Sequence, residues 1–392
     1  MNDLLLGVAA LDFSTLPQQL VNGIMIGAIY ALVALGYTMV YGILRLINFA
    51  HGEVFMLGAY ATLFTSWVLG YTPEIVKAGK FPAASVVNLL IMLAAAMLIC
   101  GLIGVIIEFF AYRPMRNQSR ISALITAIGV SLLLQYGGQL FFPAIQQNVQ
   151  QQVNPFQGSY TLVLKAPPQE LKVQLVEAQA KVKETDAKLK ELIKGGADEF
   201  NLPPEGIVLR NAKHEAERAS SKILGDIQGS SVEIGFQYGY VAVLVTTILL
   251  MVGLTYLVLK TPIGRAMRAV SHDFDSASLM GINVNRVITF TFFIGSALAG
   301  AAAMMNSTFF GTAISPFYGV ALGVKAFVAA VLGGIGNIPG AVVGGLLMGV
   351  AETLIVWAGY SGFKDAIAFV ILIAVLIFKP GGILGSAKVE KV

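Results

Sequence analysis

The sequence contains a series of apolar segments that are long enough to cross a lipid bilayer as helices. A helix rises about 1.5 Å per residue, so roughly 20 apolar residues cover the hydrocarbon layer of a membrane. The segments that approach or exceed this length lie near residues 20–44, 53–71, 83–111, 121–142, 238–259, 287–310, 338–359 and 363–378. A shorter segment, 319–334, carries Lys325 and ends in a glycine pair, which is typical of a broken or re-entrant helix. We therefore predict an all-α integral membrane protein, a polytopic helical bundle with eight or nine transmembrane spans.

The amino-acid composition excludes a soluble globular domain as the main part of the chain. Of the 392 residues, 56% are hydrophobic and only 12% are charged, and the mean hydropathy is +0.75. This is more apolar surface than one soluble core can bury. The residues before the first apolar segment lack the basic stretch of a cleaved signal peptide, so we expect the first span to direct the chain to the membrane. The single cysteine, Cys100, is interpreted as a packing or lipid-facing side chain.

The positions of Lys and Arg predict how the spans are oriented. Arg113, Arg116 and Arg120 lie in one short loop, and Lys260, Arg265, Arg268 and Arg286 flank another. Short loops rich in Lys and Arg lie on the cytoplasmic side of a membrane, which explains the pI near 9.0 without any nucleic-acid partner. With both loops in the cytoplasm, the N-terminus is periplasmic. Nine crossings then place the tail residues Lys379, Lys388 and Lys391 in the cytoplasm, which favours nine over eight.

Residues 143–237 form a hydrophilic insertion between two membrane halves, 1–142 and 238–392. Between Lys165 and Asp226 the insertion holds 11 basic and 11 acidic residues. Its apolar residues recur at alternating spacings of four and three, a heptad pattern that predicts a helix packed on another helix. They are Leu171, Leu175, Ala178, Val182, Thr185, Leu189 and Leu192, with a weaker continuation at Leu209, Ala212, Ala216, Ala219 and Ile223. A Gly- and Pro-rich break over 195–206 separates the two runs, so we predict a soluble helical hairpin.

The crossing count places this insertion, residues 143–237, in the periplasm. Its even charge balance argues against nucleic acid or anionic lipid as its target. A solvated spacer that contacts no partner remains an equally good interpretation.

The sequence lacks the common motifs of nucleotide-binding, metal-dependent and serine-nucleophile enzymes. It contains no G-x-x-x-x-G-K-[ST] phosphate-binding loop, no H-E-x-x-H metal motif, no G-x-S-x-G nucleophile motif and no cysteine pair at metal-ligand spacing. We therefore expect no catalytic residues, no cofactor and no metal, and any chemistry that drives this protein must come from a partner.

The predicted cytoplasmic loop 260–286 is the longest of the cytoplasmic loops and is strongly basic. Asp275, Ser276 and Ala277 are followed by Gly281, which resembles the E-A-A-x-x-x-G motif of ABC importer permeases. In those permeases the motif forms a short helix that lies along the membrane and docks into the ATPase. The alternative is an ordinary surface helix, with Asp273 or Asp275 at its N-terminus and Gly281 as its stop.

Two polar breaks within apolar sequence are candidates for lining a translocation pathway. Asn48, His51 and Glu53 stand between the first two spans, and ionisable groups near a bilayer usually face a pathway or a partner. They could instead satisfy backbone groups freed at a helix end. Asn337 lies in the glycine-rich segment 331–352, where tight helix packing is the alternative to a lining role. The two breaks share a pattern that would fit a weak inverted repeat.

Six motifs in order resemble the H-type permease of the branched-chain amino acid (leucine, isoleucine and valine) ABC importer family. They are INFAHGE at 47–53, IEFFAYRP at 107–114, SALITAIGVSLLLQ at 122–135, ASLMGINVNRVI at 277–288, KAFVAAVLGGIGNIPGA at 325–341 and PGGILG at 380–385. The resemblance covers nearly all of the chain outside the insertion, which most of the family replaces with a short loop.

The resemblance implies a multi-pass subunit of the bacterial inner membrane that works by alternating access. Its implied partners are a second, related permease, two ABC ATPase subunits and a periplasmic substrate-binding protein. Related permeases that carry urea or short-chain amides share some of these motifs, so those ligands stay open. A secondary transporter or channel would be expected to carry coupling carboxylates within its spans, whereas Glu108 and Glu352 lie near span ends.

Overall fold

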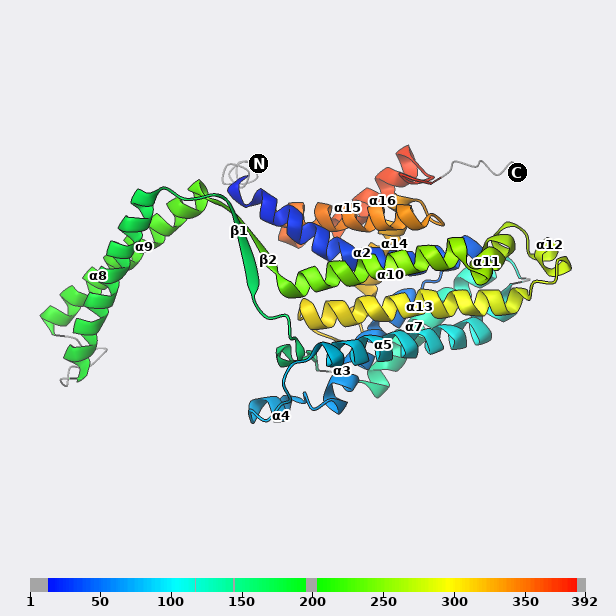
Figure 1. Ribbon diagram of the computed structural model, residues 1–392, viewed down its shortest axis with the longest axis horizontal. Coiled ribbons are helices and arrows are strands. Elements are labelled where there is room, and N and C mark those ends of the chain that lie inside the picture. Colours follow the sequence, from blue (N-terminus) through cyan, green and yellow to red (C-terminus); the bar gives the residue numbers. More distant parts are fainter. Residues whose placement is uncertain (1–12, 117, 144, 195–202, 386–392) are drawn as a thin grey trace. The chain divides into compact units, whose positions relative to one another are not determined.

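The computed structural model describes residues 13–116, 118–143, 145–194 and 203–385, and it is mostly helical (Figure 1). The chain divides into two compact units. The larger unit comprises Gln19–Ser159 and the residues from Gln237 onward, and the smaller comprises Tyr160–Phe236 with the N-terminal segment that ends at Gln18. The glycine pair 195–196 of the predicted break, and Lys388 and Lys391 of the tail, lie outside the described residues.

The larger unit is a bundle of helices. They are α2 (Leu16–Leu44, whose first turn belongs to the smaller unit), α3 (His51–Val68), α4 (Pro73–Lys77), α5 (Val86–Ile107), α6 (Arg113–Met115), α7 (Arg120–Phe141), α10 (Tyr238–Lys260), α11 (Pro262–His272), α12 (Phe274–Leu279), α13 (Val284–Phe309), α14 (Tyr318–Gly333), α15 (Ile338–Trp357) and α16 (Ala366–Phe378). A π-helical turn, Glu108–Tyr112, joins α5 to α6.

Six helical segments of the described residues are long and apolar enough to cross a membrane. They are Phe13–Leu44, Val86–Met115, Ile121–Phe141, Tyr238–Lys260, Val284–Phe309 and Ile338–Trp357. Two further apolar helices are shorter, α14 with 16 residues and α16 with 13. Helix α3 is not among the six, because His51 and Glu53 in its first turn lower its hydropathy. The predicted helical membrane architecture is therefore confirmed, while the total of eight or nine crossings stays a prediction.

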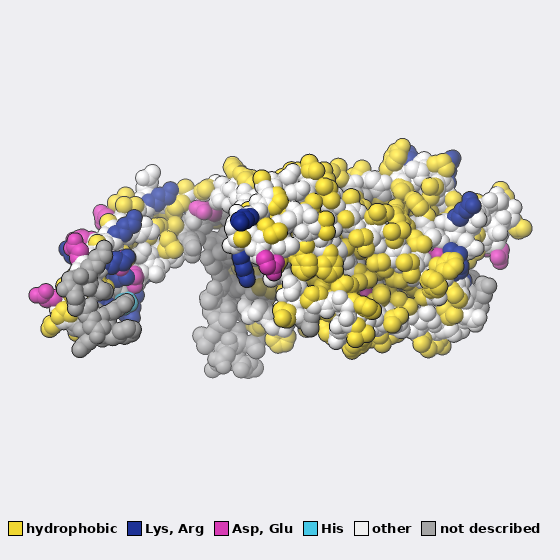
Figure 2. All heavy atoms as spheres, turned by 90° about the horizontal axis from the view of Figure 1, so that it is seen from below, with side chains coloured by type: hydrophobic (Ala, Val, Ile, Leu, Met, Phe, Trp, Pro, Cys, Tyr) yellow, Lys and Arg dark blue, Asp and Glu magenta, His cyan; other side chains and the backbone are white. Residues whose placement is uncertain are grey.

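The core of the bundle lies around α2, α3 and α13. Helix α13 packs against α3 and α5, and α14 packs against α3, α15 and α16. Phe55 of α3 and Phe292 of α13 are fully buried. In contrast, α7 and α10 expose large apolar side chains such as Leu133 (70% exposed) and Leu249 (65% exposed). Hydrophobic side chains cover much of the surface of this unit (Figure 2), as expected for a protein whose solvent is lipid.

Glycines allow two pairs of helices to approach until their backbones touch. A Cβ atom added to Gly349 of α15 would lie 2.3 Å from the backbone nitrogen of Gly27 in α2. A Cβ atom added to Gly319 of α14 would lie 2.0 Å from the carbonyl oxygen of Gly52 in α3. Only glycine permits such contacts, which are common between membrane helices.

The C-terminal segment folds back on the end of α14. The backbone N–H groups of Ile383 and Leu384 donate to the carbonyl oxygens of Leu332 and Gly333, at 2.8 and 3.1 Å. Helix ends leave carbonyl groups without partners, and within a membrane such groups are costly. The PGGILG segment, 380–385, therefore supplies hydrogen-bond donors to carbonyl groups at the end of α14.

The smaller unit contains a helical hairpin on a two-stranded sheet. Its elements are β1 (Ser159–Lys165), α8 (Gln169–Lys194), α9 (Pro204–Ser230) and β2 (Val232–Gln237). Helices α8 and α9 pack along each other, and the Lys213 Nζ of α9 lies 2.6 Å from the Asp186 Oδ1 of α8. Leu175 and Ala178 of the heptad pattern are less exposed than Val173 and Val176, so the pattern lies toward α9.

The structural boundary of this unit differs from the predicted start at residue 143. Gln147 pairs with Ile314 through two backbone hydrogen bonds, Gln147 N–H to Ile314 O at 3.0 Å and Ile314 N–H to Gln147 O at 2.7 Å. Val149 and Val153 are buried in the larger unit. The residues from 145 to 159 therefore belong to the larger unit. The pairing that holds them there joins residues far apart in the sequence, so no local sequence pattern predicts it.

Candidate functional site

The loop between α10 and α13 contains two consecutive short helices, α11 and α12. Asp273 is the N-cap of α12, and its Oδ1 accepts a hydrogen bond from the backbone N–H of Ser276 at 2.6 Å. This hydrogen bond lowers the pKa of the Asp273 carboxyl. Of the two carboxylates considered from the sequence, Asp273 is thus the cap, and Asp275 lies in the first helical turn.

Gly281 ends this element through its backbone conformation. Its φ is +82°, a region that favours glycine, and the N–H of Ile282 donates to the Ala277 carbonyl at 3.1 Å. A Cβ atom at Gly281 would meet nothing within 4 Å, so conformation and not space requires glycine here.

The tip of this loop presents apolar side chains to solvent. Ala277 of α12 is buried, whereas Leu279 is 89% exposed and Met280 is 83% exposed. Helix α11 packs against α10 and α13 and so anchors the loop on the bundle. Two adjacent exposed apolar side chains on an anchored element are suited to a protein contact.

The structure brings Asn48, His51 and Glu53 into one buried region at the start of α3. Asn48 is 2%, His51 0% and Glu53 3% exposed. The Tyr112 hydroxyl donates to Asn48 Oδ1 at 2.9 Å, and the Ser131 hydroxyl donates to Glu53 Oε1 at 3.3 Å.

Several polar atoms of this region have no hydrogen-bond partner among the described residues. They are both ring nitrogens of His51, Asn48 Nδ2 and Glu53 Oε2. The His51 ring packs edge-on against Tyr37, with centroids 4.6 Å apart. Buried polar groups are normally paired, so these unpaired atoms mark the region as a candidate functional site.

Asn337 does not join this region through its hydrogen bonds. Its Oδ1 accepts from the Gly340 N–H at 3.2 Å as the N-cap of α15, and its Nδ2 donates to the Leu384 carbonyl at 2.6 Å. Asn337 thus holds the C-terminal segment against the start of α15.

The structure contains two charged clusters that were not predicted from the sequence. In the first, Lys325 of α14 lies 2.7 Å from both Glu352 Oε1 of α15 and Asp365 Oδ1 at the start of α16. The Tyr30 hydroxyl of α2 donates to the second oxygen of Glu352. The sequence did contain a signal for this pair, a single lysine and a single glutamate in two separate apolar segments. An uncompensated charge in lipid is costly, so two such residues are expected to pair.

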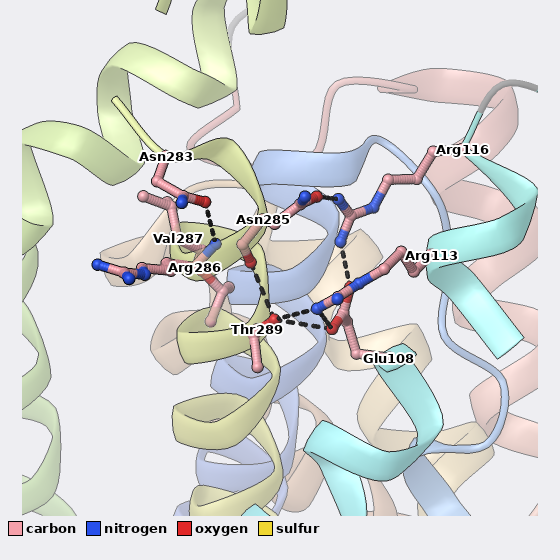
Figure 3. A network of polar contacts seen from close by, with 9 residues as sticks. Glu108, Arg113, Arg116, Asn283, Asn285, Arg286, Val287 and Thr289 are labelled. Atoms are coloured by element: carbon pink, nitrogen blue, oxygen red, sulfur yellow. Dashed lines mark hydrogen bonds and ion pairs between the residues drawn. The ribbon is translucent and has the colours of Figure 1, made fainter. Parts of the chain in front are cut away.

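In the second cluster, Glu108 receives two arginines at the π-helical turn (Figure 3). Glu108 is fully buried, and it pairs with Arg113 at 2.9 Å and with Arg116. Thr289 of α13 donates to Glu108 Oε2 at 2.8 Å, and Arg116 donates to the Asn285 side chain. These contacts join the ends of α5 and α13.

Among the described residues, no group of His, Cys, Asp and Glu side chains is arranged to hold a metal ion. The features that the structure does offer are a buried polar region within the bundle and an anchored apolar tip on one loop.

Comparison with known proteins identifies the family. Residues 19–376 match the family described as branched-chain amino acid transport system / permease component. The high-affinity branched-chain amino acid transport system permease protein BraD of Pseudomonas aeruginosa is 36% identical over 375 residues, covering 96% of this chain and 97% of the relative. The protein LivH of the same description from Escherichia coli is 36% identical over 386 residues, again covering 96% and 97%. No solved structure matches the chain. With a family match over most of its length and relatives aligned almost from end to end, the chain is a multi-pass membrane protein that belongs to the permease family of branched-chain amino acid transport systems.

Proposed function

We propose that the chain forms the translocation pathway of an ATP-driven importer for branched-chain amino acids, together with a second, related permease. The observation that carries this proposal is the relatedness along 96% of the chain to permeases named for high-affinity branched-chain amino acid transport. Two ABC ATPase subunits would supply the energy, and a periplasmic substrate-binding protein would deliver the ligand.

The loop of α11 and α12 would receive the ATPase. Its support is the exposed pair Leu279 and Met280 on an element that Asp273 and Gly281 hold in one conformation. Closure of the ATPase dimer would push or pull this loop, and α11 would pass the movement to α10 and α13, against which it packs.

The region of Asn48, His51 and Glu53 would border the pathway. Its support is the set of unpaired polar atoms on buried side chains, which can exchange hydrogen bonds with water or with a zwitterionic solute in transit. Asn337, whose side chain is engaged as a cap, would act by holding the α14–α15 break in place.

For topology, we propose an inner-membrane protein whose basic loops face the cytoplasm and whose insertion, 143–237, faces the periplasm. The support is the concentration of Lys and Arg in the loops after α5 and α10. In this arrangement α3, α14 and α16 also cross the membrane, which together with the six longer helices gives nine crossings.

Uptake in proteoliposomes tests the proposal. The complete complex would be reconstituted with ATP inside, and uptake of labelled leucine, isoleucine, valine and urea would be compared at equal concentrations of the matching binding protein. We expect ATP-dependent uptake of at least one branched-chain amino acid. Uptake of urea alone would overturn the ligand, and uptake that needs neither ATP nor the ATPases would identify a secondary transporter or channel instead.

A further inference from the structure

A pocket of about 440 Å³ opens beside the charged cluster at the ends of α5 and α13. Its polar lining consists of Arg113, Asn283, Asn285, Arg286 and Thr289. Arg113 reaches Thr289 from one side of the first turns of α13, and Arg286 extends on the other side (Figure 3). Both arginines belong to the lining of the pocket.

The charge of this part of the protein is positive. Glu108 is the one carboxylate of the cluster, and it is shared between Arg113 and Arg116. The guanidinium of Arg286 has no partner among the described residues, and only its backbone N–H is engaged, by Asn283. Three guanidinium groups against one carboxylate leave a net charge of +2, so the pocket favours an anion.

The remaining lining of the pocket is apolar. It consists of Val105 of α5 with Phe290 and Phe293 of α13, further along these helices from the charged loops. Both helices are long and apolar enough to span a membrane, and α5 exposes Leu102 and Ile106 near this level. The pocket is thus polar at the helix ends and apolar toward the membrane interior, which is the polarity gradient of a phospholipid.

We propose that this pocket binds the headgroup of an anionic phospholipid. The guanidinium groups of Arg113 and Arg286 would bind the phosphodiester, the side-chain amides of Asn283 and Asn285 offer further donors, and the start of the acyl chains would lie against Phe290 and Phe293. Basic pockets between membrane helices on the cytoplasmic side are suited to such headgroups. A free inorganic anion would satisfy the arginines but would leave the apolar half of the pocket without a partner.

Lipid binding to the purified full-length chain in detergent, measured by native mass spectrometry, tests this inference. Phosphatidylglycerol and phosphatidylcholine with the same acyl chains would be titrated separately. We expect about fivefold or greater preference for phosphatidylglycerol, the effect of one or more arginines near an anionic headgroup, and a smaller preference at high salt.

The variant R286Q removes the unpaired guanidinium and should abolish most of this preference. R265Q is the matched control, because Arg265 is another exposed arginine of the cytoplasmic loop without a side-chain partner among the described residues and lies outside the pocket. N283D is a second variant: an aspartate can keep the N-cap of α13 while it adds a negative charge to the pocket, so the preference should fall again.

Three outcomes would overturn the inference. One is equal affinity of the unaltered chain for the two lipids. Another is an equal effect of R286Q and R265Q. The third is displacement of phosphatidylglycerol by inorganic phosphate at the same concentration, which would identify a site for a free anion and not for a lipid.

Discussion

Lys325 and Glu352 form a buried ion pair between α14 and α15, with Nζ and Oε1 2.7 Å apart. Their side chains are only 8% and 11% exposed. Asp365 adds a second carboxylate to Lys325, and Tyr30 adds a hydroxyl donor to Glu352. Three helices of the C-terminal half, α14, α15 and α16, are thereby tied to α2 of the N-terminal half at one point.

Removal of one partner of this pair should destabilise the protein. K325Q leaves the buried Glu352 carboxylate without a countercharge, which costs about 3–5 kcal/mol for a buried pair. In E352Q, Lys325 keeps Asp365 as its partner, so the loss should be smaller. The double variant K325Q/E352Q carries neither charge and should recover most of the lost stability. The measurement is the apparent melting temperature of the purified chain in detergent. Additive losses in the double variant would show that the two residues act independently.

Gly281 should be essential for coupling to ATP hydrolysis. G281V forces a branched side chain into a backbone region at φ +82°, which costs on the order of 1–3 kcal/mol locally and reshapes the tip with Leu279 and Met280. We expect loss of uptake and of transport-stimulated ATP hydrolysis, with normal insertion into the membrane.

G359V is the matched control for G281V. Gly359 has φ +88°, and its added Cβ would also meet nothing within 4 Å, but it follows α15 and lies outside loop 260–286. The same backbone strain should there leave coupling intact. Normal coupled hydrolysis in G281V, or the same loss in both variants, would contradict a special role of the loop. D275K, which reverses a charge in the first turn of α12, should resemble G281V.

Glu53 should matter for transport more than for folding. E53Q keeps the size of the side chain and the acceptor for Ser131 but removes the charge beside the unpaired His51. We expect uptake to fall roughly tenfold, equal to about 1.4 kcal/mol, at an unchanged amount of folded protein. S131A is the control, since it removes the donor to Glu53 and retains the carboxylate. Loss of folded protein with normal activity per molecule would assign Glu53 a structural role.

The sequence predicted those features that depend on local composition. The apolar segments 83–111, 121–142 and 238–259 became α5, α7 and α10, because a membrane helix needs only length and hydropathy. The stop at Gly281 followed from the preference of glycine for positive φ.

The features that the sequence did not predict depend on which helices meet. Asp273 and Asp275 are both plausible caps by type, and only the backbone geometry shows that Asp273 accepts the Ser276 N–H. The pairing of Lys325 with Glu352 joins residues in separate helices. The burial of Glu108 depends on the packing of α13 against the end of α5, where Thr289 donates to Glu108. The π-helical turn that presents Glu108 to two arginines has no local composition that distinguishes it from α-helix.

We predict that the hairpin of α8 and α9 projects into the periplasm and contacts the binding protein or another envelope component. The helices are held together by a seam that is mostly leucine and valine on α8 but largely alanine on α9, so they bury little apolar area. The ion pair of Lys213 with Asp186 adds little, because both side chains are partly exposed. Val176 and Val208 are each 66% exposed, which leaves apolar side chains free for a partner.

Deletion of 165–226 with a short Gly/Ser joint, and cysteines placed in the intact hairpin, test the two parts of this prediction. The strands that flank the hairpin place its ends side by side, so a short joint can close the gap without strain on the membrane unit. We expect the deletion to raise the concentration of binding protein needed for half-maximal uptake, because a docking contact adds affinity and takes no part in the transport step. V176D/V208D in the full-length chain should have the same effect, while K188Q, on an exposed side chain, should not. Unchanged uptake at every binding-protein concentration would leave the hairpin as a spacer, and cysteines that react with an impermeant reagent only from the cytoplasmic side would reverse the proposed topology.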